Sequence, residues 1–110
     1  MKNRNIQKLE AITPGTLIVR VDIAKETQWA QFVDYRGLEL RKALKFKNHK
    51  NDFNNILVSI KAICKNRRFD NIIVGMEPTG HYWKPLANYL LKHKVNVVMV
   101  NLYHTSVQRS

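Results

Sequence analysis

Apolar residues recur along this chain with two different periods, which predict strands and helices in separate segments. Residues 17–22 and 71–76 are nearly continuous apolar runs, a pattern typical of strands buried on both faces of a sheet. Residues 27–33 predict another strand, and residues 38–46 carry apolar side chains at even spacing, which indicates a half-exposed strand. Residues 95–100 predict a fifth strand.

Two helices are predicted between these strands. The first has apolar residues at the intervals of one helical face, namely Phe53, Ile56, Leu57, Ile60, Ile63 and Cys64. Asn51 is expected to cap its amino-terminal end. The second is predicted over residues 81–92, with Leu86, Tyr89 and Leu90 facing inward.

The predicted elements follow the order β-β-β-α-β-α-β, which is an α/β pattern. An antiparallel meander followed by helical crossovers indicates a ribonuclease H-like mixed five-stranded sheet with the helices packed on it. Right-handed crossovers would place the first and fourth strands side by side at the sheet centre. The expected organisation is a polar tail over residues 1–16, one folded domain over 17–105 and a second tail over 106–110.

The chain is strongly basic. It carries 19 Lys and Arg residues against 8 Asp and Glu residues, a net charge of +11. This excess favours a polyanionic partner, nucleic acid first. A membrane surface is the weaker alternative, because no long basic amphipathic helix is present. The basic residues gather in 45–50, 65–68 and 92–94, where solvated helix ends and strand edges are an equally open explanation.

Cysteine content and hydropathy restrict the class of protein further. Cys64 is the single cysteine, which excludes an internal disulfide and any multi-cysteine metal site, and its position predicts a plain core thiol. No apolar stretch near Met1 is long enough for a signal peptide, and the run 97–100 is too short to span a bilayer. We therefore expect a cytoplasmic protein without membrane contact.

Two acids stand at the ends of the two apolar strands predicted to be neighbours. Asp22 closes the first strand, and Glu77 directly follows the fourth. Ligands collect beyond the carboxyl ends of parallel strands, and strands lie ~4.8 Å apart. The two carboxylates can therefore share a hard divalent cation such as Mg²⁺ or Mn²⁺. The plainer alternatives are an Asp22 that caps the following turn and a Glu77 that is a solvated loop carboxylate.

A two-metal phosphoryl-transfer site needs more oxygen ligands than this pair supplies. The other acids from Glu26 onward fall at the far hairpin, in a turn or beside the first helix, and none follows Glu77. If this is a metal-dependent nuclease site, half of its ligands are missing from the chain.

The segment 77–83 is dense in residues with special chemistry. His81 is a candidate general base or phosphate ligand, or a structural histidine. Tyr82 and Trp83 can stack on bases or pack against the core. The candidates for nucleic-acid contact are Lys25, Lys45, Lys47, Lys50, Arg67, Arg68, His81, Tyr82, Trp83 and Lys84.

Two motifs carry a resemblance to a known family. They are residues 21–25, Val-Asp-Ile-Ala-Lys, with Trp29 downstream, and residues 75–83, Gly-Met-Glu-Pro-Thr-Gly-His-Tyr-Trp. They resemble the DEDD-type insertion-sequence transposases of the one-ten (one-sixteen, nine-oh-two) group, and the likeness extends over residues 17–105. The resemblance implies an amino-terminal RuvC-like domain of ribonuclease H fold, magnesium, recombination of the element's DNA, and work with a guide RNA. Asp22 and Glu77 match the first two of the family's four acids, as catalytic residues and metal ligands.

Three departures from the family pattern matter. Arg20 replaces a usual Gly, and its guanidinium can pair with Asp22 and compete with metal. Leu102 stands where the family has Pro, and the chain stops at Ser110, before the third and fourth acids and the nucleophilic serine. The resemblance therefore implies a carboxy-terminally truncated piece with little or no activity alone.

Three functions are compatible with these observations. The first is the nuclease-like domain of a transposase or recombinase that acts on DNA with a divalent metal, a homo-oligomer being left open. The second is a non-enzymatic basic module that binds DNA or RNA. The third, an actin- or sugar-kinase-like nucleotide binder, ranks last, because residues 24–26 lack a glycine-rich phosphate turn.

Overall fold

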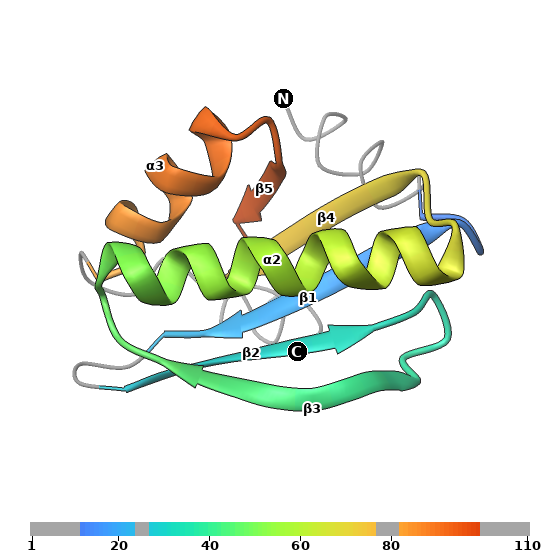
Figure 1. The fold of residues 1–110 in the computed structure, drawn as a ribbon, viewed down its shortest axis with the longest axis horizontal. Helices are drawn as coiled ribbons and strands as arrows, with labels where there is room; N and C mark the ends of the chain where they lie inside the picture. Colours follow the sequence, from blue (N-terminus) through green and yellow to red (C-terminus); the bar gives the residue numbers. More distant parts are fainter. Residues whose placement is uncertain (1–11, 24–26, 77–81, 100–110) are drawn as a thin grey trace, which may run out of the picture.

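The computed structural model describes residues 12–23, 27–76 and 82–99. The elements, in chain order, are β1 (Thr16–Asp22), β2 (Gln28–Val33), β3 (Glu39–Phe46), α2 (Lys50–Arg67), β4 (Asn71–Met76), α3 (Lys84–Lys92) and β5 (Asn96–Met99) (Figure 1). This order is the predicted one. The strands begin or end within about two residues of the predicted positions, as is usual for element boundaries.

The strands form one five-stranded sheet in the order β3-β2-β1-β4-β5. β1 runs antiparallel to β2, and β2 runs antiparallel to β3. β4 lies parallel to β1, and β5 lies parallel to β4. The sheet is therefore mixed, and the prediction that the first and fourth strands are central neighbours is confirmed.

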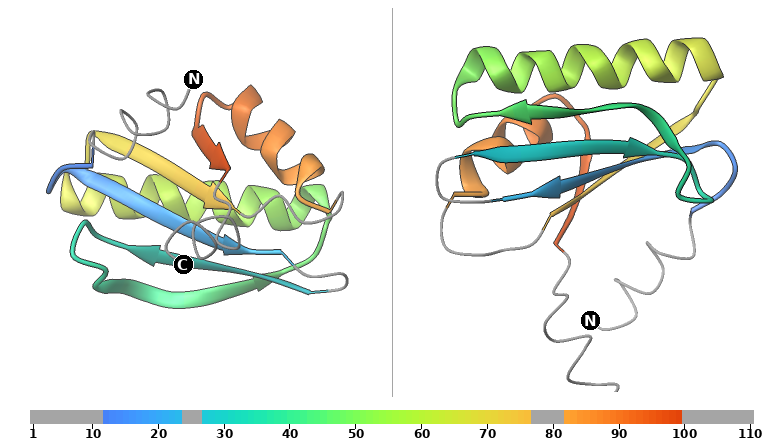
Figure 2. Two further views of the ribbon diagram at one scale, coloured as in Figure 1. Left: turned by 180° about the vertical axis from the view of Figure 1, so that it is seen from behind. Right: turned by 90° about the horizontal axis from the view of Figure 1, so that it is seen from below.

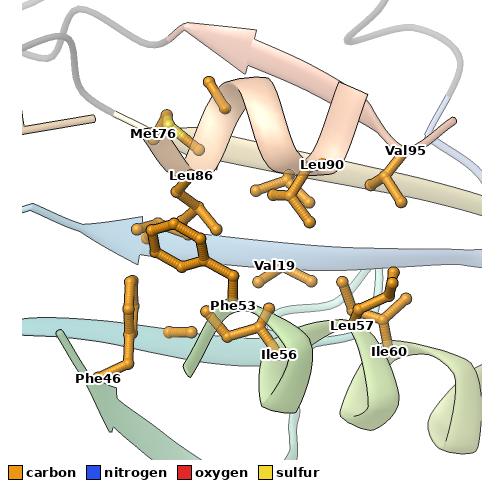
Figure 3. Packing of buried hydrophobic residues seen from close by; sticks show 14 of the residues in the cluster. Val19, Phe46, Phe53, Ile56, Leu57, Ile60, Met76, Leu86, Leu90 and Val95 are labelled. Carbon is orange, nitrogen blue, oxygen red and sulfur yellow. The ribbon is translucent and has the colours of Figure 1, made fainter. Parts of the chain in front are cut away.

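Both α2 and α3 pack on one face of this sheet (Figures 1 and 2). In β1, Leu17, Val19 and Val21 are buried against the helices, whereas Arg20 and Asp22 alternate with them and are exposed. We call the face that carries Arg20 and Asp22 the second face. The two helices bury apolar side chains in this core, namely Phe53, Ile56, Leu57 and Ile60 from α2 and Leu86 and Leu90 from α3 (Figure 3).

The apolar face predicted for α2 is confirmed. Ile56 and Ile60 are fully buried, and Ile63 and Cys64 are half-buried against the same core. Burial raises the pKa of the Cys64 thiol, which is the direction expected for a cysteine that packs rather than reacts.

The predicted amino-terminal cap of α2 is wrong. The helix begins at Lys50, so Asn51 lies inside the first turn, and His49 occupies the cap position without a side-chain capping bond. Asp52 accepts a hydrogen bond at 2.7 Å from the Lys47 backbone N–H, which closes the loop ahead of the helix. The other end stops at Arg68, whose positive φ of 58° lets its N–H reach the Cys64 carbonyl.

Two further boundaries differ from prediction. α3 starts at Lys84 because Tyr82 and Trp83 form a turn before it; residue 81, the predicted start, lies outside the described residues. In β3 the alternation is interrupted by a register shift that places Arg41 opposite Phe32. The Arg41 guanidinium then lies 5.4 Å from the Phe32 ring centroid and donates to Ser59 of α2. This contact is not visible in a pattern of period two.

The hairpin between β2 and β3 is held by Asp34, a buried carboxylate. Its Oδ1 accepts the backbone N–H groups of Arg36 and Leu38, both at 2.9 Å, and its Oδ2 lies 2.9 Å from the Arg36 guanidinium. Gly37 has a φ of 85°, which favours glycine. Burial alone would raise the Asp34 pKa, but these hydrogen bonds and the Arg36 charge outweigh it, so the pKa lies below its ordinary value.

Replacing Ile60 by Ala should lower the free energy of unfolding by about 2–5 kcal/mol, because a fully buried side chain leaves a cavity between α2 and the sheet. The matched control is Val58→Ala on the exposed side of the same helix, which should change stability by less than about 0.5 kcal/mol. Urea denaturation followed by circular dichroism measures both. Equal losses for the two variants would contradict the packing described above.

Replacing Asp34 by Asn should destabilise the protein in a pH-dependent way. The folded-state pKa of Asp34 is lowered, so its stabilisation is present above the unfolded-state pKa of ~3.9 and is lost as the pH falls through the folded value. The stability difference between wild type and Asp34→Asn should therefore be largest near neutral pH and should shrink as the pH falls below ~3.9. Urea midpoints of both proteins at neutral pH and at a pH below ~3.9 measure this difference, and a difference independent of pH would refute the assignment.

Candidate metal and nucleic-acid site

Asp22 is the last residue of β1 and is exposed on the second face. The parallel ladder between β1 and β4 pairs Arg20 with Gly75 and Val21 with Met76. The next residue after Met76 is Glu77, which lies outside the described residues, so the predicted meeting of the two carboxylates is not described. The structure does show that β1 and β4 are parallel neighbours as far as Val21 and Met76.

Arg20 lies two residues before Asp22 on the same face. It is exposed, and it is paired in the sheet with Gln31 on one side and Gly75 on the other. No ion pair joins Arg20 to Asp22. The ion pair found in the described parts of the chain is Arg36–Asp34, in the turn between β2 and β3. The competition for Asp22 that Arg20 was expected to offer is therefore not seen.

On the second face, Asp22 begins a row of three side chains of different chemistry, one from each of three neighbouring strands. Asp22 of β1 is the Cα partner of Trp29 in β2, and Trp29 is the partner of Lys45 in β3. All three side chains are exposed, with Trp29 at 42%. A carboxylate, an indole and an ammonium group thus follow one another across three strands.

Basic residues continue along the same edge of the sheet. β3 ends and α2 begins there, so Lys47 and Lys50 are exposed near the end of β1. Asn48, between them, donates from its side chain to the Tyr82 carbonyl at 3.2 Å, which ties this loop to the turn before α3. Lys84 at the start of α3 is therefore close to the same loop (Figure 1).

Tyr82 and Trp83, both nominated for base stacking, have different surroundings. Tyr82 is 41% exposed. Trp83 is half-buried and packs against the core, and the Lys84 ammonium lies 5.9 Å from its ring centroid. Of the two, Tyr82 has the ring that a ligand can reach.

Both arginines nominated for nucleic-acid contact lie elsewhere. Arg67 and Arg68 are exposed at the carboxy-terminal end of α2. With 18 residues, this helix places them roughly 27 Å from Lys50. The structure does not bring them to the Asp22 edge, and Lys25 and His81 lie outside the described residues.

Sequence reasoning missed a groove between α2 and α3 with both polar and apolar lining residues and a volume of about 650 Å³. Its lining includes Lys50, Asn54, Asn88, Lys92 and His93. The Tyr89 and His93 rings lie 4.4 Å apart beside it. These residues come together only when the two helices pack, so no local sequence motif predicts the groove.

Among the described residues no cluster of three or more His, Cys, Asp or Glu side chains could hold a metal.

The sheet order, with two antiparallel strands beside a parallel set, defines an α/β protein of ribonuclease H-like fold. A solved structure from Bacteroides thetaiotaomicron, a protein with an actin-like ATPase fold and unknown function, superposes with a TM-score of 0.52 at 15% identity. The match covers 90% of this chain and 37% of that one, so this chain spans little more than a third of that protein. The likeness supports the predicted fold and carries no function.

A family model described as a transposase, of the DEDD IS110 type, matches residues 19–110. The chain therefore belongs to this transposase family, and the predicted resemblance is confirmed. No curated protein matches the sequence. Within the described ranges, neither helix is long and apolar enough to cross a membrane.

Proposed function

We propose that this chain is the amino-terminal, nuclease-like part of a transposase that acts on DNA with a divalent metal. The supporting observation is the parallel pairing of β1 with β4 up to Val21 and Met76. If that ladder continues by one residue, Asp22 stands beside Glu77, with strands ~4.8 Å apart. The family match supports the reaction class, and Asp22 and Glu77 are the proposed catalytic and metal-binding pair.

The described chemistry of Asp22 suits a hard cation. Its carboxylate is exposed, and no described hydrogen bond or ion pair occupies it. Mg²⁺ is commonly held by one or two carboxylates, several waters and the substrate phosphates, so a pair of acids is a sufficient protein contribution. When bound, the metal would activate the attacking oxygen and stabilise the leaving one.

The residues around Asp22 would bind and orient the polyanion. Lys45, Lys47, Lys50 and Lys84 are exposed near the same edge, and the chain as a whole carries +11. Such a field attracts DNA, and a guide RNA is a further proposed partner through the family resemblance. The sequence supplies two of the four family acids, so we propose that these 110 residues alone bind nucleic acid without cutting it.

A non-enzymatic nucleic-acid-binding module is the rival function. The observation that favours it is the spread of exposed basic groups to Arg67 and Arg68, away from Asp22. The two functions differ in whether Asp22 and the residues near it matter more than basic groups elsewhere.

Replacing Asp22 by Asn should weaken binding of Mn²⁺ or Mg²⁺ at least tenfold while leaving the fold intact, because the side chain is exposed and makes no described hydrogen bond. Paramagnetic broadening of the NMR signals of Val21 and Asp22 by Mn²⁺ measures the loss. Glu39→Gln, an exposed acid at the start of β3, is the control with the same change in charge. The same metal response in both variants would refute the site.

The double variant Lys45→Gln, Lys47→Gln should lower DNA affinity more than Arg67→Gln, Arg68→Gln, although both remove two positive charges. If each lysine contacts one phosphate, the slope of log affinity against log salt should become shallower by roughly 1.4–1.8. Fluorescence anisotropy over a salt series measures both variants. Equal losses would favour the rival module, in which total charge rather than position determines binding.

A further inference from the structure

The chain contains two tryptophans, and the structure uses them differently. Trp83 is half-buried in the turn before α3 and packs against the core. Trp29 is the second residue of β2 and lies beside the end of β1, with its indole on the second face, where 42% of the residue is exposed. Its neighbours in β2, Ala30 and Phe32, are fully buried on the helix face. The packing of the described core does not explain why a large indole stands at this position.

The sheet register places Trp29 between two opposite charges. It is the Cα partner of Asp22 on one side and of Lys45 on the other. Residues directly opposite in antiparallel strands have Cβ atoms ~4.5–5.5 Å apart and point to the same face. An aromatic surface is therefore flanked by the proposed metal ligand and by a cation suited to a phosphate.

We propose that Trp29 is a stacking platform for one unpaired base of the DNA strand held at Asp22. Lys45 then contacts a phosphate on the side away from Asp22, and the base on the indole fixes the position of the strand along the sheet. This inference rests on the proposed function, because Asp22 supplies its frame of reference. It adds a substrate requirement: the strand must be single or locally opened, since a base within a duplex has no free face to offer.

The chemistry of the row selects a nucleotide over other occupants. The exposed indole attracts any flat ring, but Lys45 and the charge of +11 add a requirement for negative charge beside it. A base attached to a phosphodiester chain meets both requirements. An apolar protein segment would leave Lys45 and Asp22 without partners, at a cost in desolvation.

Tryptophan fluorescence gives a test that requires neither metal nor activity. In Trp83→Phe, Trp29 is the single tryptophan. We would titrate the 110-residue chain, in EDTA and at constant salt, with oligothymidylate, with an abasic phosphodiester of equal length and with a duplex. Base-dependent stacking predicts strong quenching by oligothymidylate and little by the other two. Equal quenching by the abasic strand or by the duplex would overturn the proposal, and an oligouridylate arm tells whether RNA serves equally.

A second set of variants covers the case in which Trp83→Phe disturbs the core. Trp29→Ala should weaken oligothymidylate binding roughly 10- to 100-fold, and Trp29→Phe should lose less because it keeps a ring. Neither variant should change the affinity for the abasic strand. Both should change the urea midpoint no more than substitutions of exposed residues usually do. Equal affinity for oligothymidylate in wild type and Trp29→Ala would refute the stacking role.

These outcomes are separable from those of the metal site. If Asp22→Asn loses metal while Trp29 shows no base-dependent quenching, the proposed function stands and this inference fails. If Trp29 stacks on bases while Asp22→Asn and Glu39→Gln respond equally to metal, the stacking surface is real and the metal-dependent function fails.

Discussion

The parallel pairing of β1 with β4 is the constraint on which the rest of the molecule depends. Parallel neighbours need a crossover that returns the chain to the starting edge of the sheet. α2 provides it: its 18 residues extend roughly 27 Å, comparable to the roughly 23 Å of the seven-residue β1. Because the helix spans the sheet, β4 begins beside Thr16 and ends beside Val21. The length of one helix thereby brings Asp22 and the end of β4 to the same edge.

The elements that could be predicted are those whose signal is local and repeated. The apolar face of α2 recurs over several turns, and the continuous apolar runs of β1 and β4 allow few alternatives. The errors arose where a tertiary contact outweighed a local preference. Asn51 is a good capping residue, but the bond from Lys47 to Asp52 closes the loop so that the helix starts earlier. Arg41 leaves the alternation of β3 because it reaches Ser59 and covers Phe32.

The candidate site was predictable only in part, for a similar reason. Asp22 could be found because it ends an apolar strand, and its neighbour strand follows from chain topology. The row through Trp29 and Lys45 could not, because it depends on the registers of two hairpin ladders at once. The basic clusters were visible as charge, but the sequence did not say that Arg67 and Arg68 lie at the opposite end of α2 from Lys50. Likeness to an actin-like ATPase fold does not help here, because a shared fold does not determine the function.

The carboxylate of Asp34 has a consequence that extends well beyond its own turn. Side chains in a strand alternate between faces, so a slip of β2 by a single residue would turn its outward side chains inward and its inward ones outward. Phe32 would then meet solvent, and the indole of Trp29 would be forced into the packed layer beneath the helices. The hairpin closure around Asp34 and Gly37 opposes that slip from the far end of the strand. The buried carboxylate beyond one end of β2 thus helps to determine which side chains the other end of that strand turns toward solvent.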